Sequence, residues 1–565
     1  MSPIDWIVLL GTLFAIVAYG VWKTRNNKDI HGYLKGGNSM GWAAIGLSVM
    51  ATQASAITFI STPGQAYESG MAFVQNYFGL PLALIIVSAV FIPIYYKLNV
   101  YTAYEYLEKR FDLNTRLLAA FLFLVQRGLA AGITIYAPAI ILSAALGWNL
   151  NFTILFVGIL VIIYTVSGGT KAVAITQKWQ MAVIMLGMFI AFYTILNKIP
   201  DEVSFTESLS VAGAMDRLNI VDFSFNLDVR YTFWSGITGG LFLALSYFGT
   251  DQSQVQRYLG GKSVTESRLG LMFNALLKVP MQFFILLVGV MVFVFFQFSK
   301  HEVLFDKASV ELVQQTEYVG EFEALEAKHQ ANHALKQATI KQFLEADEIE
   351  KAQLKQELKT LDEKEKAIRN EAKAIVKKAI PGNDAKDSDY VFLSFILNYL
   401  PKGLVGLLLA VIISAAMSST SGELNALGTT TMIDFYKRLF KQEASEKFYV
   451  NASKIITAIW GVLAISFALL ANLLENLIEA VNILGSLFYG TILGIFVVAF
   501  FLKKIDAKAV FFGALLAETI VLFLFIFYSD LIAYLWLNVI GCVMVTLISF
   551  ILNKFIVLKP LSPKR

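Results

Sequence analysis

Charged residues are scarce in this sequence. Of its 565 residues, 16% are Asp, Glu, Lys or Arg, whereas soluble domains carry about 25%. Hydrophobic residues make up 57% and the mean hydropathy is +0.63. This shortage of charge excludes an ordinary soluble protein and indicates that much of the chain lies in lipid.

Cysteine and strong net charge are lacking as well. The single cysteine, Cys542, excludes intramolecular disulfides and cysteine-cluster metal sites, and it fits a small core residue within an apolar run. The net charge of +4 comes without a basic block, which argues against nucleic acid as a partner. The apolar runs hold no nucleophile–base pair or metal triad, so we do not expect an enzyme.

Long apolar runs are abundant. Runs of about 20 residues, enough to span a hydrocarbon core about 30 Å thick, recur from Ile7–Trp22 to Ile532–Leu552. We therefore predict an all-α polytopic membrane protein with about 13 transmembrane helices. Their centres fall near residues 14, 54, 86, 126, 158, 188, 242, 284, 408, 461, 492, 518 and 543.

The distribution of Lys and Arg predicts the topology. Asp5 precedes the first apolar run and Lys23, Arg25 and Lys28 follow it, which indicates a retained first span rather than a signal peptide. This places the N-terminus outside the cell and the C-terminus in the cytoplasm, in a plasma (cell inner) membrane. The basic residues expected in the cytoplasm are Lys97, Lys109, Arg110, Arg116, Lys171, Lys178, Arg257, Lys262, Arg268, Lys437, Arg438, Lys441, Lys447, Lys503, Lys504, Lys508, Lys559, Lys564 and Arg565.

Residues 299–389 do not fit a membrane span. They are rich in Lys, Glu, Ala and Gln, and we expect a charged helical extracellular insertion between transmembrane parts 1–298 and 390–565, whose partner is left open. Its histidines are His301, His329 and His333. Because no third metal ligand stands in a clear pattern with His329 and His333, we interpret these two as part of a solvated helix face. Coiled-coil-like spacing links Leu354, Leu358, Leu361, Ile368, Ala372 and Ile375, with Glu365 interrupting.

Three apolar runs carry polar clusters, which are costly in lipid and indicate function. The clusters centre on Gln53, on Asp251, and on Ser418 with Ser419. The two adjacent serines, with the carbonyl of Ala415 one turn earlier, offer the hard oxygen ligands that suit Na⁺. Small hydroxylated residues also join helices, but three such clusters favour a binding path beside a broken helix.

The chain resembles the sodium/solute symporter family, nearest its branch carrying iodide, vitamins and monocarboxylates. The resemblance covers nearly all of the chain except the insertion. The segments that carry it are YEYLEKRF (Tyr104–Phe111), IYAPAIIL (Ile135–Leu142), YTVSGGTKAV (Tyr164–Val173), TDQSQVQRYL (Thr250–Leu259) and ISAAMSSTSGELNA (Ile413–Ala426).

The resemblance implies a LeuT-type fold of two five-helix inverted repeats. It also implies a Na⁺ site formed by the carbonyls of Ala51, Ala54 and Ala415 and the hydroxyls of Ser418 and Ser419. The substrate, a small organic solute or an anion, is expected beside Gln53, Thr58, Tyr77, Tyr247, Lys278 and Asn482. Tyr247 matches an aromatic gate, whereas Lys278 has the alternative of reaching toward the inner surface.

Gln177 stands where the family usually has an aspartate that helps to hold a second Na⁺. The partner positions are Ser418, Ser421 and Gly422, so this second site lacks both its charge and a ligand. We therefore expect Na⁺-driven symport by alternating access with one Na⁺ per cycle. Gln53, Thr58 and Tyr77 make a hexose a less favoured substrate. The alternatives are a proton-coupled carrier, a uniporter, or a transporter-like sensor that signals through the insertion.

Overall fold

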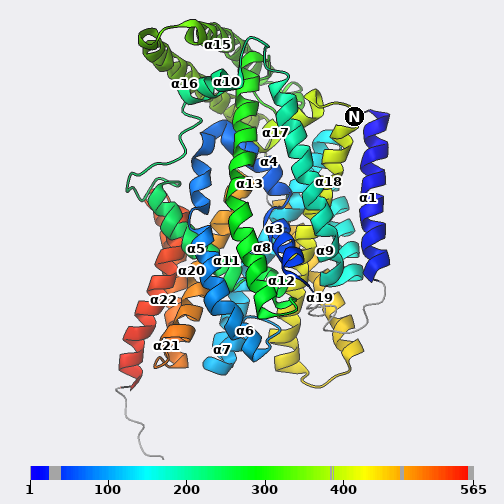
Figure 1. The fold of residues 1–565 in the computed structure, drawn as a ribbon, viewed down its shortest axis with the longest axis vertical. Helices are drawn as coiled ribbons and strands as arrows, with labels where there is room; N and C mark the ends of the chain where they lie inside the picture. The colour runs from blue at the N-terminus through cyan, green and yellow to red at the C-terminus, as the bar shows by residue number, and fades with distance from the viewer. Residues whose placement is uncertain (1, 25–39, 382–384, 386, 471–475, 558–565) are drawn as a thin grey trace, which may run out of the picture.

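The computed structural model describes residues 2–24, 40–381, 385, 387–470 and 476–557. Within these ranges the regular elements are helices, and an isolated bridge joins Met40 to Gly261. The helices form an upright bundle with a smaller helical body at one end (Figure 1). We call that end the insertion end, because residues 299–389 lie there.

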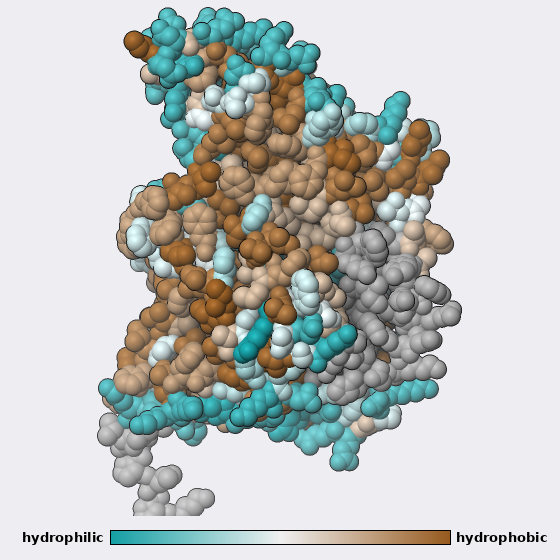
Figure 2. Space-filling model, viewed as in Figure 1, coloured by the Kyte–Doolittle hydropathy of each residue, from teal (hydrophilic) through white to brown (hydrophobic). Residues whose placement is uncertain are grey.

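The surface of the bundle agrees with a membrane protein. A broad apolar band crosses the middle of the face in view, and hydrophilic residues gather on the insertion and along the opposite end (Figure 2). Among the described residues, eight helices are long and apolar enough to cross a membrane, and four shorter apolar helices accompany them. Apolar side chains such as Phe14 and Phe527 point outward, being 76% and 67% exposed, as expected for a surface that meets lipid.

The helices follow the predicted spans closely. Each predicted centre lies within a helix except residue 54, which falls at a break between two helices. The two centres at 158 and 188 share one helical element, α9 (Leu150–Leu196). Its residues Lys171 and Lys178 have side chains outside the described set, as do Lys23, Arg25, Lys28 and the terminal residues Lys559, Lys564 and Arg565. The other long helices are α1 (Pro3–Thr24), α8 (Leu113–Leu146), α13 (Val264–Phe298), α18 (Leu404–Thr430), α19 (Glu446–Leu470), α20 (Leu477–Phe501), α21 (Ala507–Tyr528) and α22 (Tyr534–Val557).

Two helices are interrupted within the bundle. α3 (Trp42–Gln53) and α4 (Ala56–Ser69) are separated by Ala54, with ψ of 70°, and by Ser55, which is extended. α11 (Gly240–Gly249) and α12 (Gln252–Leu259) are separated at Asp251, whose side chain accepts a hydrogen bond from the N–H of Ser253 at 2.8 Å. Small and capping residues rather than large aliphatic ones occupy both breaks, so helix propagation stops there.

Close packing holds α4 against α13. A Cβ atom placed on Gly289 of α13 would lie 2.3 Å from the carbonyl oxygen of Pro63 in α4. Such close approach of two backbones needs glycine, as is common between transmembrane helices. α13 also packs on α3, so one continuous helix supports both halves of the interrupted pair.

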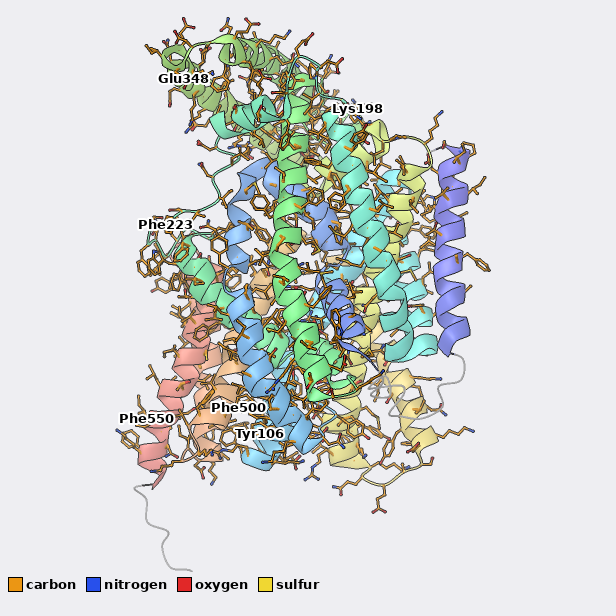
Figure 3. The ribbon with its side chains drawn as sticks, in the orientation of Figure 1. Tyr106, Lys198, Phe223, Glu348, Phe500 and Phe550 are labelled. Carbon is orange, nitrogen blue, oxygen red and sulfur yellow. The ribbon has the colours of Figure 1, made fainter. Side chains whose placement is uncertain are left out.

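Shorter helices connect these elements. Between α4 and α8 lie α5 (Leu80–Ile86), α6 (Ile92–Leu98) and α7 (Glu105–Arg110). Tyr106 of α7 lies at the end opposite the insertion, where its ring is 5.0 Å from that of Phe500 in α20, whereas Lys198, after α9, lies toward the insertion end (Figure 3). The remaining short helices are α10 (Phe205–Ala214), α14 (Lys307–Val313) and α17 (Ser388–Tyr399).

The insertion is a helical hairpin, which confirms the prediction of helix in this segment. α15 (Val319–Glu345) packs along α16 (Glu348–Ala379), and both project from one end of the bundle (Figure 1). Glu365, which interrupts the apolar spacing of α16, is buried and pairs with Lys336 of α15. The prediction that His329 and His333 lie on a solvated helix face is wrong, since their exposed fractions are 0% and 4%.

Candidate functional site

The polar clusters converge on α18. This helix contacts α3, α4 and α12, and it also packs along α8 and α9. Ser418, Ser419 and Ser421 are buried in these contacts. Segments more than 300 residues apart in the sequence therefore bring their polar groups to one region of the bundle.

Ser418 and Ser419 differ in their hydrogen bonding. The hydroxyl of Ser419 donates to the carbonyl oxygens of Ala415 and Ala416, at 3.1 Å each. The hydroxyl of Ser418 is buried and forms no hydrogen bond with any residue that the structure describes. A buried hydroxyl without a partner is costly, so Ser418 is a side chain to which an ion or solute offers a partner.

The break between α3 and α4 supplies backbone oxygens. The last carbonyls of a helix have no partner within the helix. Here the N–H of Ala54 returns to Met50 at 2.7 Å, and the Thr58 hydroxyl donates to the Gln53 carbonyl at 3.4 Å. Ala51 and Ala54 are both buried at this break. The geometry thus offers carbonyl oxygens on helices that contact α18.

Gln177 is engaged with α3. Its side-chain oxygen accepts a hydrogen bond from the Ser48 hydroxyl at 2.7 Å, and its amide donates to the Thr52 hydroxyl at 3.3 Å. The amide therefore joins α9 to α3 without contributing a charge. Ser421, expected at the second ion position, has a buried hydroxyl with no hydrogen-bond partner among the described residues.

Arg257 lies beside Gly422. A Cβ atom on Gly422 would lie 2.2 Å from the Nη2 atom of Arg257 and 4.0 Å from the methyl group of Thr52. The guanidinium is fully buried, and none of its nitrogens has a hydrogen-bond partner within the described chain. The prediction that Arg257 lies in a cytoplasmic loop is therefore wrong, since this residue is buried on α12. Glycine at position 422 leaves room for its guanidinium against α18.

A cavity of about 100 Å³ lies between the interrupted helices and α20. Four of the predicted substrate residues line it: Gln53, Tyr77, Tyr247 and Asn482. Thr58 and Lys278 are outside this lining. Lys278 is fully buried with its Nζ atom 5.6 Å from the centre of the Tyr77 ring, so it does not reach toward the surface.

The sequence analysis missed a charged network in the wall of the cavity. Arg127 of α8 pairs with Asp251 at the α11–α12 break and, at 3.0 Å, with Glu423 of α18. The hydroxyl of Tyr489 in α20 donates to Asp251 at 2.7 Å and accepts from Arg127. Arg127 stands in the middle of an apolar run, and this isolated charge was the signal that would have identified it.

A membrane-spanning helical bundle whose two interrupted helices border a cavity lined by both polar and apolar side chains defines a secondary transporter of the broken-helix class. Comparison with known proteins specifies the class further. The model of the sodium:solute symporter family matches residues 33–320 and 368–517. The chain belongs to the sodium:solute symporter family.

Relatives of the chain are Na⁺-coupled transporters. It is 26% identical over 520 residues to sodium-coupled monocarboxylate transporter 2 of Mus musculus, covering 91% of this chain and 71% of the relative. It is 27% identical over 532 residues to the sodium/sialic acid symporter SiaT of Proteus mirabilis (strain HI4320), covering 92% and 89%. Human sodium/iodide cotransporter is 32% identical over 275 residues, 48% of this chain and 42% of the relative.

A solved structure shares the fold. The substrate-bound outward-open state of a Na⁺-coupled sialic acid symporter superposes with a TM-score of 0.75 at 23% identity, covering 98% of each chain. The predicted LeuT-type fold is thereby confirmed, whereas the number of spans stays a prediction. As a member of its family, the chain is an integral membrane sodium:solute symporter.

Proposed function

We propose that this symporter imports a small organic solute or anion with one Na⁺ per cycle by alternating access. The N-terminus and the insertion face outward in this proposal, and the C-terminus faces the cytoplasm. The observation that carries it is the buried hydroxyl of Ser418, which has no hydrogen-bond partner among the described residues and stands on α18, the helix that contacts both α3 and α4.

The Na⁺ ligands in this proposal are the carbonyls of Ala51, Ala54 and Ala415 with the hydroxyls of Ser418 and Ser419. Two features support the set. The break at Ala54 gives carbonyls that the helix does not use, and Ser418 lacks a partner within the described chain. A bound ion would hold α18 against both halves of the interrupted helix, and so couple Na⁺ binding to the shape of the cavity.

The single-ion stoichiometry rests on Gln177 and Arg257. Gln177 brings no charge, and its amide is occupied by Ser48 and Thr52. The buried guanidinium of Arg257 lies against Gly422, where the second ion of two-ion members would have its ligand. A fixed positive charge there repels a further cation, and more strongly than in water because the site is desolvated.

The cavity favours a small solute. Its volume of about 100 Å³ is below the roughly 300–1,000 Å³ typical of sites for drug-sized ligands. The side-chain oxygens of Gln53 and Asn76 are buried there without hydrogen-bond partners among the described residues. One Na⁺ entering at 100 mV contributes about 2.3 kcal/mol, enough to concentrate a neutral solute about fiftyfold.

The direction of transport is inferred from the basic residues. α1 begins at the insertion end, and α22 ends at the opposite end (Figure 1). Lys109 and Arg110 lie on α7, which is at that opposite end (Figure 1). Arg110 donates to the carbonyl of Leu502, next to Lys503, at 3.1 Å, and Arg438, next to Lys437, pairs with Glu108 of α7 at 2.6 Å. Because short cytoplasmic loops collect Lys and Arg, this end faces the cytoplasm.

Uptake into proteoliposomes tests the proposal. The purified protein is offered labelled monocarboxylates, iodide, sialic acid, vitamins and polyols under an inward Na⁺ gradient, a pH gradient, or neither. We expect accumulation of one class only with Na⁺, with one charge moved per neutral solute. Uptake that follows the pH gradient and ignores Na⁺ would instead identify a proton-coupled carrier, and solute binding without transport would identify a sensor.

A pair of serine variants tests the ion site. Ser418→Ala should abolish Na⁺-dependent uptake, since it removes a proposed ligand. Ser421→Ala is the matched control on the same helix, and should leave the Na⁺ half-saturation unchanged with a Hill coefficient near 1. A loss of Na⁺ dependence in Ser421→Ala, or a ratio of two Na⁺ per solute, would contradict the single-ion proposal.

A further inference from the structure

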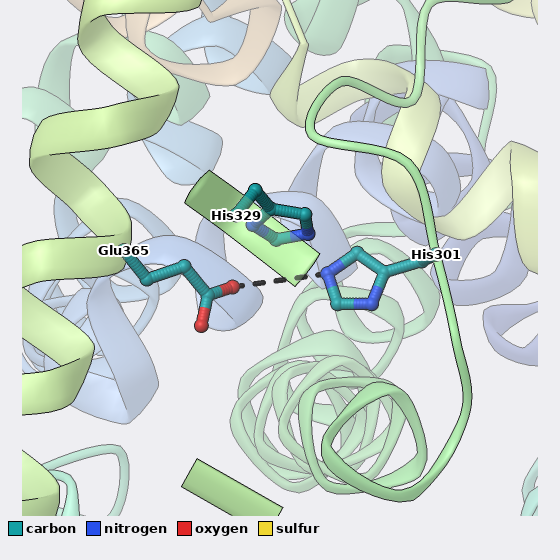
Figure 4. A group of neighbouring side chains, drawn as sticks. All are labelled: His301, His329 and Glu365. Carbon is teal, nitrogen blue, oxygen red and sulfur yellow. Dashed lines mark ion pairs between the residues drawn. The ribbon is translucent and has the colours of Figure 1, made fainter. Parts of the chain in front are cut away.

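Three buried histidines gather where the insertion meets the bundle. His301 lies shortly after the end of α13, and His329 and His333 lie on α15. Glu365 of α16 completes the group, and its carboxylate faces His301 while His329 lies between them (Figure 4). Since the four side chains come from three segments, their meeting is a product of the tertiary structure.

The geometry is that of a compact ligand set. One ligand atom from each of His301, His329 and Glu365 lies within 4.8 Å of the other two. The Nε2 atom of His301 is 3.7 Å from Oε1 of Glu365. The His301 ring meets those of His329 and His333 edge to face, with centroids 4.9 and 5.0 Å apart. Tetrahedral ligands about 2.0–2.1 Å from a zinc ion lie about 3.3–3.4 Å apart, so a pair of these atoms would close by at most about 1.5 Å.

The ring nitrogens lack ordinary partners. Neither nitrogen of His329 makes a hydrogen bond with any residue in the described ranges, and Nε2 of His301 has only its 3.7 Å contact with Oε1 of Glu365. His329 is 0% exposed, so its nitrogens are also withdrawn from bulk solvent. Buried polar atoms are nearly always paired in native proteins, and aromatic packing alone leaves these nitrogens unsatisfied.

Burial disfavours the charged form of both histidines of α15. It lowers the pKa of His329 and of His333, and the neighbouring His301 acts in the same direction. Burial acts to raise the pKa of Glu365, but the charge of Lys336 and the contact with His301 outweigh it and hold this pKa well below its ordinary value.

Neighbouring groups fix the ligands. The side-chain amide of Gln330 donates to the carbonyl oxygen of His301 at 2.7 Å, which holds the loop in place. Lys336 bonds the second carboxylate oxygen of Glu365, leaving Oε1 directed at His301. Oriented outer groups of this kind are a regular feature of metal sites. The same lysine places a positive charge near the group. Because this charge repels a metal cation, we expect the group to bind metal ions with moderate affinity.

We propose that His301, His329 and Glu365, with His333 beside them, bind a Zn²⁺ ion that fastens the insertion end of α13 to α15 and α16. Two imidazoles and one carboxylate are a zinc-type donor set, and hard cations such as Mg²⁺ and Ca²⁺ prefer all-oxygen sites. α13 packs on both α3 and α4. Zinc would therefore stiffen the helix that supports the interrupted pair. The site lies outside the transport cavity and does not depend on which solute is carried.

Zinc titration of the full-length chain tests the proposal. The protein, purified with a tag that contains no histidine, is stripped with a chelator and dialysed. We expect ZnCl₂ to bind at about one ion per chain and to raise the melting temperature, because a ligand that binds the native state stabilises it. MgCl₂ and CaCl₂ should do neither. Absence of zinc binding to the wild-type chain would overturn the proposal.

Variants locate the site. His301→Gln and His329→Gln should each abolish the shift of melting temperature caused by zinc. Lys328→Gln, which changes the exposed neighbour of His329 on α15, is the matched control and should keep the full shift. Zinc binding that survives both histidine substitutions would overturn the assignment. Should a variant fail to fold, the absorption spectrum of the Co²⁺-substituted wild-type chain decides: tetrahedral bands are expected, and an octahedral spectrum contradicts the site.

Discussion

At the scale of single residues, function is marked by buried polar atoms that lack partners. Leaving a buried donor or acceptor unsatisfied costs about 1–3 kcal/mol. The Ser418 hydroxyl and the Gln53 side-chain oxygen both bear this cost within the described chain. Such unpaired polar groups lower the stability of the fold. Their presence in this part of the bundle agrees with a role in binding an ion and a solute.

Gln53 and Thr58 give a matched test of the cavity. Gln53 lines the cavity, whereas the Thr58 hydroxyl is turned to the Gln53 carbonyl at 3.4 Å. Gln53→Ala should raise the KM for the solute about three- to tenfold, the value of one neutral hydrogen bond, without changing the Na⁺ half-saturation. Thr58→Val should change KM less than twofold. Uptake kinetics measure both values of KM. If Thr58→Val raised KM more than Gln53→Ala, Thr58 would lie beside the solute, as predicted from the sequence.

At the scale of elements, helix breaks and close helix contacts position these residues. α3 and α4 stop short of each other at Ala54 and Ser55, while α13 runs past both. The interrupted pair is therefore held from outside by a continuous helix.

The contact between Gly289 and Pro63 should be sensitive to a single methyl group. Gly289→Ala places a Cβ 2.3 Å from the Pro63 carbonyl oxygen, and overpacking of this kind costs about 1–3 kcal/mol. Gly320→Ala on α15 is the control, since nothing lies within 4 Å of its Cβ, and it should be neutral or slightly stabilising. Thermal unfolding in detergent measures both. Equal melting temperatures for the two variants would contradict this prediction, because they would mean that α4 and α13 move apart at little cost to admit the methyl group.

Asp306, the N-cap of α14, predicts a pH dependence of the insertion. Burial raises the pKa of Asp306 from its ordinary 3.8 to about 6. The folded state then holds a proton that the unfolded chain has lost, so stability falls as pH rises from about 4 to about 6 and stays low above that range.

Asp306→Asn keeps an N-cap side chain and removes the titration. It should raise the stability at pH 7 by up to about 3 kcal/mol and flatten its change between pH 4 and 6. Asp347→Asn, at the exposed N-cap of α16, is the control and should do neither. The measurement is the melting temperature across pH. An unchanged pH profile in Asp306→Asn would contradict the raised pKa.

At the scale of the whole molecule, buried ion pairs join the insertion to the bundle. Arg217, after α10, donates to the Tyr67 carbonyl at 2.8 Å and pairs with Asp362 of α16 at 3.1 Å. The adjacent residue, Asp216, forms a half-buried pair with Lys359 at 2.7 Å. The two pairs join the same segments and differ mainly in burial.

That difference in burial predicts unequal effects. Arg217→Ala leaves Asp362 without one of its buried partners and should cost about 3–5 kcal/mol. Lys359→Ala removes a pair that water still reaches and should cost about 1 kcal/mol or less. Thermal unfolding and limited proteolysis of the insertion check both. Equal losses in the two variants would mean that burial does not set the strength of this junction.

The sequence determined the membrane class, the positions of the spans and the polar clusters. The lengths of apolar runs and local polarity are local properties, so they can be read without knowing any contact. Ser418, Gln53 and Tyr247 were predicted in this way. Arg127 was missed, because its partners Asp251 and Glu423 lie 124 and 296 residues away.

Only the tertiary structure decided what each buried charge and each histidine faces. Arg257 was predicted in a loop and lies instead against Gly422. His329 was predicted in solvent and lies instead against His301 and Glu365. The scarcity of charged residues was enough to indicate that much of this chain lies in lipid. The partners of its few charges were set by helix packing, because helical periodicity specifies which face is buried and not which side chain it will meet.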